Sequence, residues 1–235
     1  MSIGRIRVIA LDCYGTMINF GDAQFIAVMA EICDRQGLTA DPSDMWHRFI
    51  RISTGARSAT SSQPFLTMTE LWTAQFQKLF RQMRLDGNVP EAIAHLRQGL
   101  AEADAFPEAL PTVEALRPHY RLAVLSNADD DFLLPCLRRN RLQFETIVSS
   151  EEAKAAKPDP AIFRTISERL DIPPEFILYV GDNPLVDIVG SRAAGLPAAW
   201  VNRSGMRRPR AAPTPDIMVS SLSQLLPILA PIRAA

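Results

Sequence analysis

The sequence predicts an α/β protein: a Rossmann-like parallel sheet flanked by helices, with an inserted all-helical cap. Two observations carry this prediction. After residue 107, short apolar runs alternate with helical periodicities, the pattern of a parallel sheet covered on both faces. Between residues 17 and 106 the periodicities are helical only, and they follow a single strand-like run at residues 6–11.

Composition excludes several classes of protein. The chain has 235 residues, 47% hydrophobic and 22% charged, with a net charge of -1. We therefore expect no nucleic-acid partner, and no apolar run has the length of a membrane span. The N-terminus lacks the pattern of a signal peptide, and the odd number of widely spaced cysteines predicts reduced thiols. We expect a cytoplasmic protein that is a monomer or homodimer; a small anionic substrate is expected from the residues described below.

Helices are predicted in the inserted segment at residues 23–36, 43–52, 68–83 and 89–102. The first has apolar residues on one helix face, and Gly37 ends it. The small and polar residues 53–64 predict a loop between the second and third helices. Residues 17–106 are therefore predicted to form the cap.

Strands in the remainder are predicted at residues 121–126, 146–149, 176–181, 198–202 and 216–219. Helices are expected between and after them at residues 132–140, 161–170, 185–194 and 222–229, and Pro135 must lie in the first turn of its helix or kink it. The strand at residues 6–11 belongs with this set. Residues 1–16 and 107–235 are therefore predicted to form the α/β core.

Residues with useful chemistry stand where these strands end. Asp12 follows the first strand, Ser126 and Asn127 end the second, Asp182 ends the fourth, and Lys157 precedes a helix. Taken singly, each could be a helix cap, a turn residue or a surface charge. Ligands of parallel sheets bind beyond the carboxyl ends of the strands, so we expect these residues to converge. Such a group suits a carboxylate nucleophile, a hard cation and an anionic substrate.

Four ordered stretches, "ALDCYGT", "AVLSNA", "KPDPAIF" and "YVGDNPLVD", resemble the motifs of the haloacid dehalogenase (HAD) superfamily. The resemblance covers nearly the whole chain and implies a helical cap of the C1 type. It implies that Asp12 is the nucleophile, that Thr16 and Ser126 hold substrate oxygens with Asn127 nearby, and that Lys157 neutralises charge. For magnesium it implies Asp12, Asp182 and the backbone carbonyl of Tyr14 as ligands, with Asp187 acting through water or from the second shell.

Tyr14 stands where phosphatases of this superfamily usually carry a second aspartate that transfers the proton of the leaving group. A phenol with a reference pKa of about 10 is poorly matched to proton transfer near neutrality. "DCYGT" and "AWVNRSG" instead resemble the 2-haloacid dehalogenase branch, whose halide leaving group needs no proton. That branch generally lacks the Gly181-Asp182 pair, which this chain keeps. Without a cation, Asp182 would repel Asp12 by about 4 kcal/mol at 4 Å and an effective dielectric of 20.

The favoured interpretation is a magnesium-dependent phosphatase acting on a small phosphorylated metabolite. The alternative is a metal-independent 2-haloacid dehalogenase, and a third hypothesis is a non-catalytic HAD-like binding protein. In "DMWHRF", Arg48 lies one place beyond the position of the dehalogenase cap arginine and is a candidate for binding the substrate anion, or else a solvated surface charge. Tyr14 is a further candidate for contacting substrate, or else packs against the cap.

Overall fold

The computed structural model describes residues 3–56 and 65–229. Its sheet is parallel throughout. Its six strands lie in the order β3-β2-β1-β4-β5-β6, which confirms the predicted Rossmann-like core. The strand order reverses between β1 and β4, so the switch point of the sheet lies between those two strands. The strands are β1 (Val8–Leu11), β2 (Arg121–Ser126), β3 (Thr146–Ser149), β4 (Ile177–Gly181), β5 (Ala198–Val201) and β6 (Ile217–Val219).

The central strands are apolar along their whole length because helices cover both faces of the sheet. Every residue of β1 and of β4 is buried. Alternate residues of β1 face opposite sides of the sheet. Ile9 and Leu11 join the apolar cluster that includes α5 (Ala109–Leu116) and α10 (Leu225–Leu229), while Val8 and Ala10 pack with α8 (Pro160–Leu170). Continuous apolar runs are the pattern expected of strands buried on two faces.

Most helices match the predicted ones, and the main differences are local. α5 and α7 were not expected, because both are short and Pro111 lies in the first turn of α5. A π-helical turn at Pro184–Ile188 precedes α9 where one helix was predicted. α2 extends to Ala56, and residues 57–64 of the predicted loop lie outside the described residues. Pro135 lies inside α6 and not in its first turn. The helices are α1 (Asp22–Gln36), α2 (Pro42–Ala56), α3 (Met68–Met83), α4 (Val89–Glu102), α5 (Ala109–Leu116), α6 (Asp130–Arg139), α7 (Ser150–Ala153), α8 (Pro160–Leu170), α9 (Val189–Ala193) and α10 (Leu225–Leu229).

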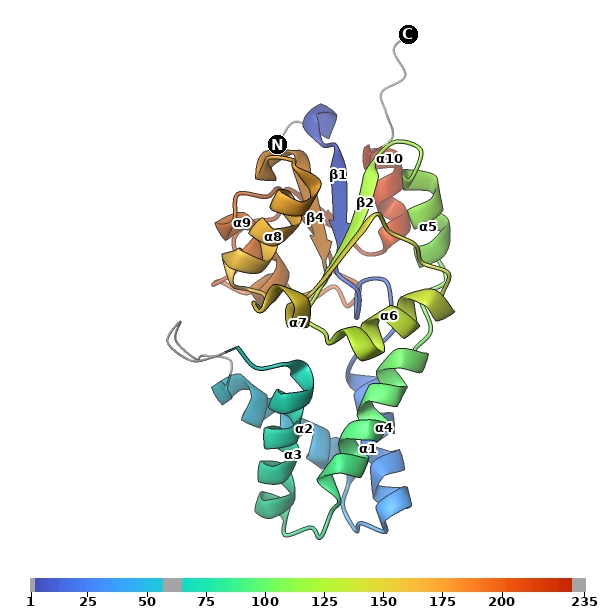
Figure 1. Ribbon diagram of the computed structural model, residues 1–235, viewed down its shortest axis with the longest axis vertical. Coiled ribbons are helices and arrows are strands. Elements are labelled where there is room, and N and C mark those ends of the chain that lie inside the picture. The colour runs from blue at the N-terminus through green and yellow to red at the C-terminus, as the bar shows by residue number, and fades with distance from the viewer. Residues whose placement is uncertain (1–2, 57–64, 230–235) are drawn as a thin grey trace.

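Helices α1 to α4 lie together below the sheet in Figure 1. The two chain segments that lead into and out of them run side by side: Ile18 and Ala105 form an antiparallel bridge, and the N–H of Phe106 donates to the carbonyl of Met17 at 2.8 Å. The helical pattern of this segment is as expected, and its division from the core at residues 17 and 106 stays a prediction. Across the described residues, no helix combines the length and the apolar character needed to cross a membrane.

Candidate active site

A cavity of about 240 Å³ opens beside the carboxyl ends of β1, β2 and β4, next to the switch point. β1 delivers Asp12 to it and β4 delivers Asp182, so the two acids come from neighbouring strands. Its lining includes seven of the residues singled out from the sequence: Asp12, Tyr14, Ser126, Asn127, Lys157, Asp182 and Asp187.

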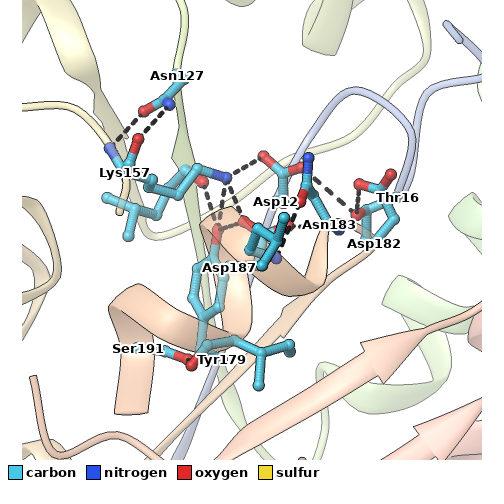
Figure 2. A network of polar contacts seen from close by, with 12 residues as sticks. Asp12, Thr16, Asn127, Lys157, Tyr179, Asp182, Asn183, Asp187 and Ser191 are labelled. Atoms are coloured by element: carbon cyan, nitrogen blue, oxygen red, sulfur yellow. Dashed lines mark hydrogen bonds and ion pairs between the residues drawn. The ribbon is translucent and has the colours of Figure 1, made fainter. Parts of the chain in front are cut away.

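Lys157 lies at the centre of the polar network (Figure 2). Its ammonium nitrogen is 2.7 Å from Oδ1 of Asp12, 2.7 Å from Oδ1 of Asp187 and 2.8 Å from the hydroxyl of Tyr179. An ammonium has three hydrogens, so these partners account for all of them. The lysine side chain is only 3% exposed. Its charge is therefore held in one place between the two acids.

Tyr179 is a site residue that the sequence reasoning missed. It lies within the buried strand β4, and its hydroxyl accepts from Lys157 and donates to the carbonyl of Leu125 at 3.1 Å. A signal was available: Tyr179 is the one side chain with a polar atom in the run "ILYVG", and a buried tyrosine hydroxyl needs a partner.

Thr16 connects the two acids of the neighbouring strands. Its hydroxyl donates to Oδ1 of Asp182 at 3.0 Å and lies 3.5 Å from Oδ2 of Asp12. Gly15 has φ +85°, and a Cβ at this position would lie 2.6 Å from Oδ2 of Asp182. The turn after Asp12 therefore requires glycine, both for its backbone conformation and for the close approach of Asp182.

Asp187 is buried beneath the other acids by the π-helical turn. Oδ1 accepts from Lys157, and Oδ2 accepts from the backbone N–H of Asn183 at 2.9 Å. A Cβ on Gly181 would lie 2.4 Å from the Asp187 carboxyl carbon, so the end of β4 also requires glycine. Both oxygens of Asp187 already have partners, which suits a supporting role behind Asp182 better than direct contact with a ligand.

The charges of the site are unbalanced. One ammonium faces three carboxylates whose ligand atoms all lie within 4.8 Å of one another. Burial raises the pKa of Asp182 to about 8, and the charges of Asp12 and Asp187 add to the shift. Burial also raises the pKa of Asp12 to about 6 despite the nearby ammonium. Burial alone would lower the pKa of Lys157, but Asp12 and Asp187 outweigh it and hold that pKa above its usual range.

This donor set fits a divalent cation such as magnesium, which prefers oxygen ligands and is commonly held by one or two carboxylates. Asp12 and Asp182 would supply those carboxylates. The backbone carbonyl of Tyr14 stays a predicted third ligand.

The hydroxyl of Tyr14 faces two helices. The Tyr14 ring lines the cavity, but its hydroxyl lies 3.3 Å from the carbonyl oxygen of Leu100 in α4 and 3.4 Å from that of Phe132 in α6. Burial raises the pKa of this phenol. Tyr14 therefore stays protonated and donates to the backbone of two helices, which is unsuited to transferring protons near neutral pH.

Asn127 and Ser126 follow each other at the end of β2 but have different surroundings. The Asn127 amide is paired with the backbone of Lys157, donating to its carbonyl at 2.9 Å and accepting from its N–H at 2.7 Å. It therefore holds the lysine segment in place. Ser126 is 2% exposed and lines the cavity.

Arg48 is not among the described residues that line the cavity. Its guanidinium pairs with Asp44, one turn earlier on α2, at 2.8 Å, and its side chain is 46% exposed. The structure does not bring it to the other candidate residues.

Known proteins similar to this chain include both dehalogenases and phosphatases. Haloacetate dehalogenase H-2 from Moraxella sp. (strain B) is 27% identical over 96% of this chain and 99% of its own length. A phosphoserine phosphatase from Thermus thermophilus is 32% identical over 71% of this chain and 70% of its own length. The solved structure of an L-2-haloacid dehalogenase from Xanthobacter autotrophicus shares the fold, with a TM-score of 0.80 at 18% identity over 97% of this chain and 99% of that chain. The family model for haloacid dehalogenase-like hydrolases matches residues 6–195, and the chain belongs to this family.

Proposed function

We propose that this family member is a magnesium-dependent phosphatase that uses Asp12 as the nucleophile on a small phosphate ester. The observation that carries the proposal is the position of Asp182. Its carboxylate shares the Thr16 hydroxyl with Asp12, in a cavity where one ammonium faces three carboxylates. Two ionised carboxylates 4 Å apart repel by about 4 kcal/mol at an effective dielectric of 20, and without a cation Asp182 avoids this cost by staying mostly protonated below about pH 8. A cation held by Asp12 and Asp182 would turn this repulsion into attraction.

When bound, magnesium would neutralise and orient the oxygens of the phosphoryl group. The chain's own residues would do the rest. A carboxylate oxygen of Asp12 attacks phosphorus, the leaving oxygen departs with the electrons of the broken bond, and an aspartyl-phosphate forms. Lys157 would keep its bond to Asp12 and offset negative charge, and the hydroxyl of Ser126, a residue of the cavity lining, would contact a substrate oxygen. Water then attacks phosphorus, which releases phosphate and restores Asp12.

A second candidate is the metal-independent 2-haloacid dehalogenase. Tyr14 favours it, because a halide leaves without a proton and the phenol is bonded to backbone carbonyls. The haloacetate dehalogenase relative also aligns over more of this chain than the phosphatase relative does. In this chemistry, Asp12 displaces the halide from carbon and water hydrolyses the resulting ester. The raised pKa of Asp182 lowers the repulsion at neutral pH without metal, because most of that carboxyl is protonated below about pH 8.

A parallel assay separates the two reactions. The purified chain is incubated with aryl, acyl and alkyl phosphates and with short 2-haloacids, each with magnesium and with chelator. The proposal expects phosphate release that requires magnesium and disappears in chelator. Haloacid turnover that persists in chelator, together with no phosphate release from any ester, would reject it in favour of the dehalogenase. Turnover of neither class would favour a non-catalytic binding protein.

A further inference from the structure

One part of the cavity lining, called the wall below, is apolar and mostly aromatic. It contains the rings of Tyr14, Phe20 and Phe25, together with Val186. Phe20 meets Phe25 edge-on at 4.7 Å between ring centroids, and Tyr14 meets Phe20 in the same manner at 6.1 Å. Behind them, Trp46 stacks on Phe25 at 4.2 Å with an angle of 6° between the rings. Each ring of the wall is therefore held in its orientation by neighbouring rings before any substrate enters.

Cationic groups, by contrast, are scarce among the described residues of the cavity lining. Of the described residues that line it, Lys157 alone carries a positive charge, and its three hydrogens are bonded to Asp12, Asp187 and Tyr179. A carboxylate on the non-reacting part of a substrate would therefore be partly desolvated against aromatic rings without a cation of its own. Burying an unpaired ion costs several kcal/mol.

We infer that the site selects phosphate esters whose leaving group is apolar and uncharged, such as an aryl group or a short hydrocarbon chain. This inference rests on the proposed function and names its substrate class. Tyr14 gives independent support for the aryl members of the class. An aryl oxide leaves with the electrons of the broken P–O bond and takes a proton from water afterwards, so no enzyme acid is needed, and the phenol of Tyr14 supplies none. The cavity of about 240 Å³ limits such groups to small ones.

Phosphonates test this selection by binding alone, because their P–C bond is not hydrolysed at Asp12. Butylphosphonate and 3-phosphonopropionate are close in size and differ by a carboxylate, and phenylphosphonate adds the ring. We would measure their binding to the full chain in magnesium by titration calorimetry. We expect phenylphosphonate and butylphosphonate to bind at least about ten-fold more tightly than 3-phosphonopropionate, because only the latter buries an unpaired ion.

Substitution of the wall gives the complementary test. Phe25→Arg places a cation in the cavity and should improve binding of 3-phosphonopropionate about ten-fold while weakening that of phenylphosphonate. Phe25→Met removes the ring without adding charge and should weaken only phenylphosphonate. Met218→Arg is the matched control: it adds the same charge on β6, where the side chain is 63% exposed and outside the cavity lining, and should change neither affinity.

The outcomes separate this inference from the proposed function. Binding of 3-phosphonopropionate to the unmodified chain as tightly as butylphosphonate would overturn the inference and leave the phosphatase proposal standing. An equal effect of Phe25→Arg and Met218→Arg would do the same. Absence of binding by all three phosphonates, together with haloacid turnover in chelator, would overturn both.

Discussion

The hydroxyl oxygen of Tyr14 lies 3.3 Å from the carbonyl oxygen of Leu100, although Tyr14 follows Asp12 by only two residues. This contact joins the turn after β1 to α4, one of the four helices that lie below the sheet. At the position where the sequence resemblance implies a second aspartate in phosphatases, this chain carries a phenol whose hydroxyl lies near backbone carbonyls of two helices. Substitution of Tyr14 therefore gives the sharpest prediction about the chemistry.

Tyr14→Asp should raise the hydrolysis of alkyl phosphates, because a carboxyl group beside the leaving oxygen can donate and then accept a proton. A positioned acid or base typically contributes about 10² to 10⁴ in rate, and we expect the lower end of this range in an unadapted site. The measurement is kcat for an alkyl phosphate and for p-nitrophenyl phosphate, with Tyr14→Asn as the control that removes the phenol without adding an acid. Equal rates in the Asp and Asn variants would contradict the prediction. Under the dehalogenase alternative, Tyr14→Asp should instead lower haloacid turnover, because it adds negative charge beside an anionic substrate.

Asp12→Asn should abolish turnover under either reaction, because an amide cannot form the covalent intermediate. The variant removes a charge from a site rich in carboxylates, so we expect it to fold and to melt no lower than the unmodified chain. Activity assays and thermal melts on the same preparation check both statements. Near-normal turnover by the folded variant would show that Asp12 is not the nucleophile.

Lys157→Met should damage both activity and stability. The ammonium is bonded to Asp12 and Asp187, and its removal leaves these buried acids without a cation. Breaking a buried ion pair by removing one partner typically costs about 3–5 kcal/mol. Urea denaturation should show this loss in chelator, and magnesium should restore part of it by pairing with the carboxylates. Lys154→Met, which changes an exposed lysine in the same way, is the control. If Lys157→Met lowered the free energy of unfolding no more than Lys154→Met, the role assigned to Lys157 would be refuted.

Magnesium should stabilise the protein more at high pH than at low pH. Without metal, burial raises the pKa of Asp182 from 3.8 in the unfolded chain to about 8 in the folded one. At any pH between about 4 and 8, the folded state therefore binds more protons than the unfolded state. The protonation of Asp182 therefore stabilises the folded state. This stabilisation is complete below about pH 4 and is lost as the pH rises through about 8.

Magnesium competes with protons for Asp182, so its effect follows the opposite trend. The rise in Tm on adding MgCl₂ should be larger at pH 8.5 than at pH 5.5. Asp182→Asn should remove most of the difference between the two pH values. If magnesium raised Tm equally at the two pH values, or more at pH 5.5, the result would argue against a metal at Asp182.

Arg48→Ala should change little. The side chain is exposed and pairs with Asp44 at the spacing of one helical turn, an interaction worth about 0.3–0.5 kcal/mol. We expect kcat/KM for the preferred substrate to stay within about two-fold, since the guanidinium lies outside the cavity lining. A ten-fold or greater loss would return Arg48 to the substrate site that the sequence pattern indicated.

The sequence by itself determined the architecture and the grouping of the candidate residues. Apolar runs without polar interruptions predict strands buried on both faces, and the carboxyl ends of parallel strands share one edge of a sheet. Asp12, Ser126 and Asp182 each end such a run, so their convergence followed from the pattern alone.

Only the tertiary structure decided the direction of particular side chains. Tyr14 meets carbonyl groups of α4 and α6, Tyr179 lies beside the ammonium of Lys157, and Arg48 pairs within its own helix. The two carbonyls near the Tyr14 hydroxyl are 86 and 118 residues away in the chain, and Lys157 is 22 residues away from Tyr179. A local pattern reports the periodicity of one segment and the face that it buries. Which distant polar atom meets a given hydroxyl depends on how whole elements pack, and no short stretch of sequence encodes that.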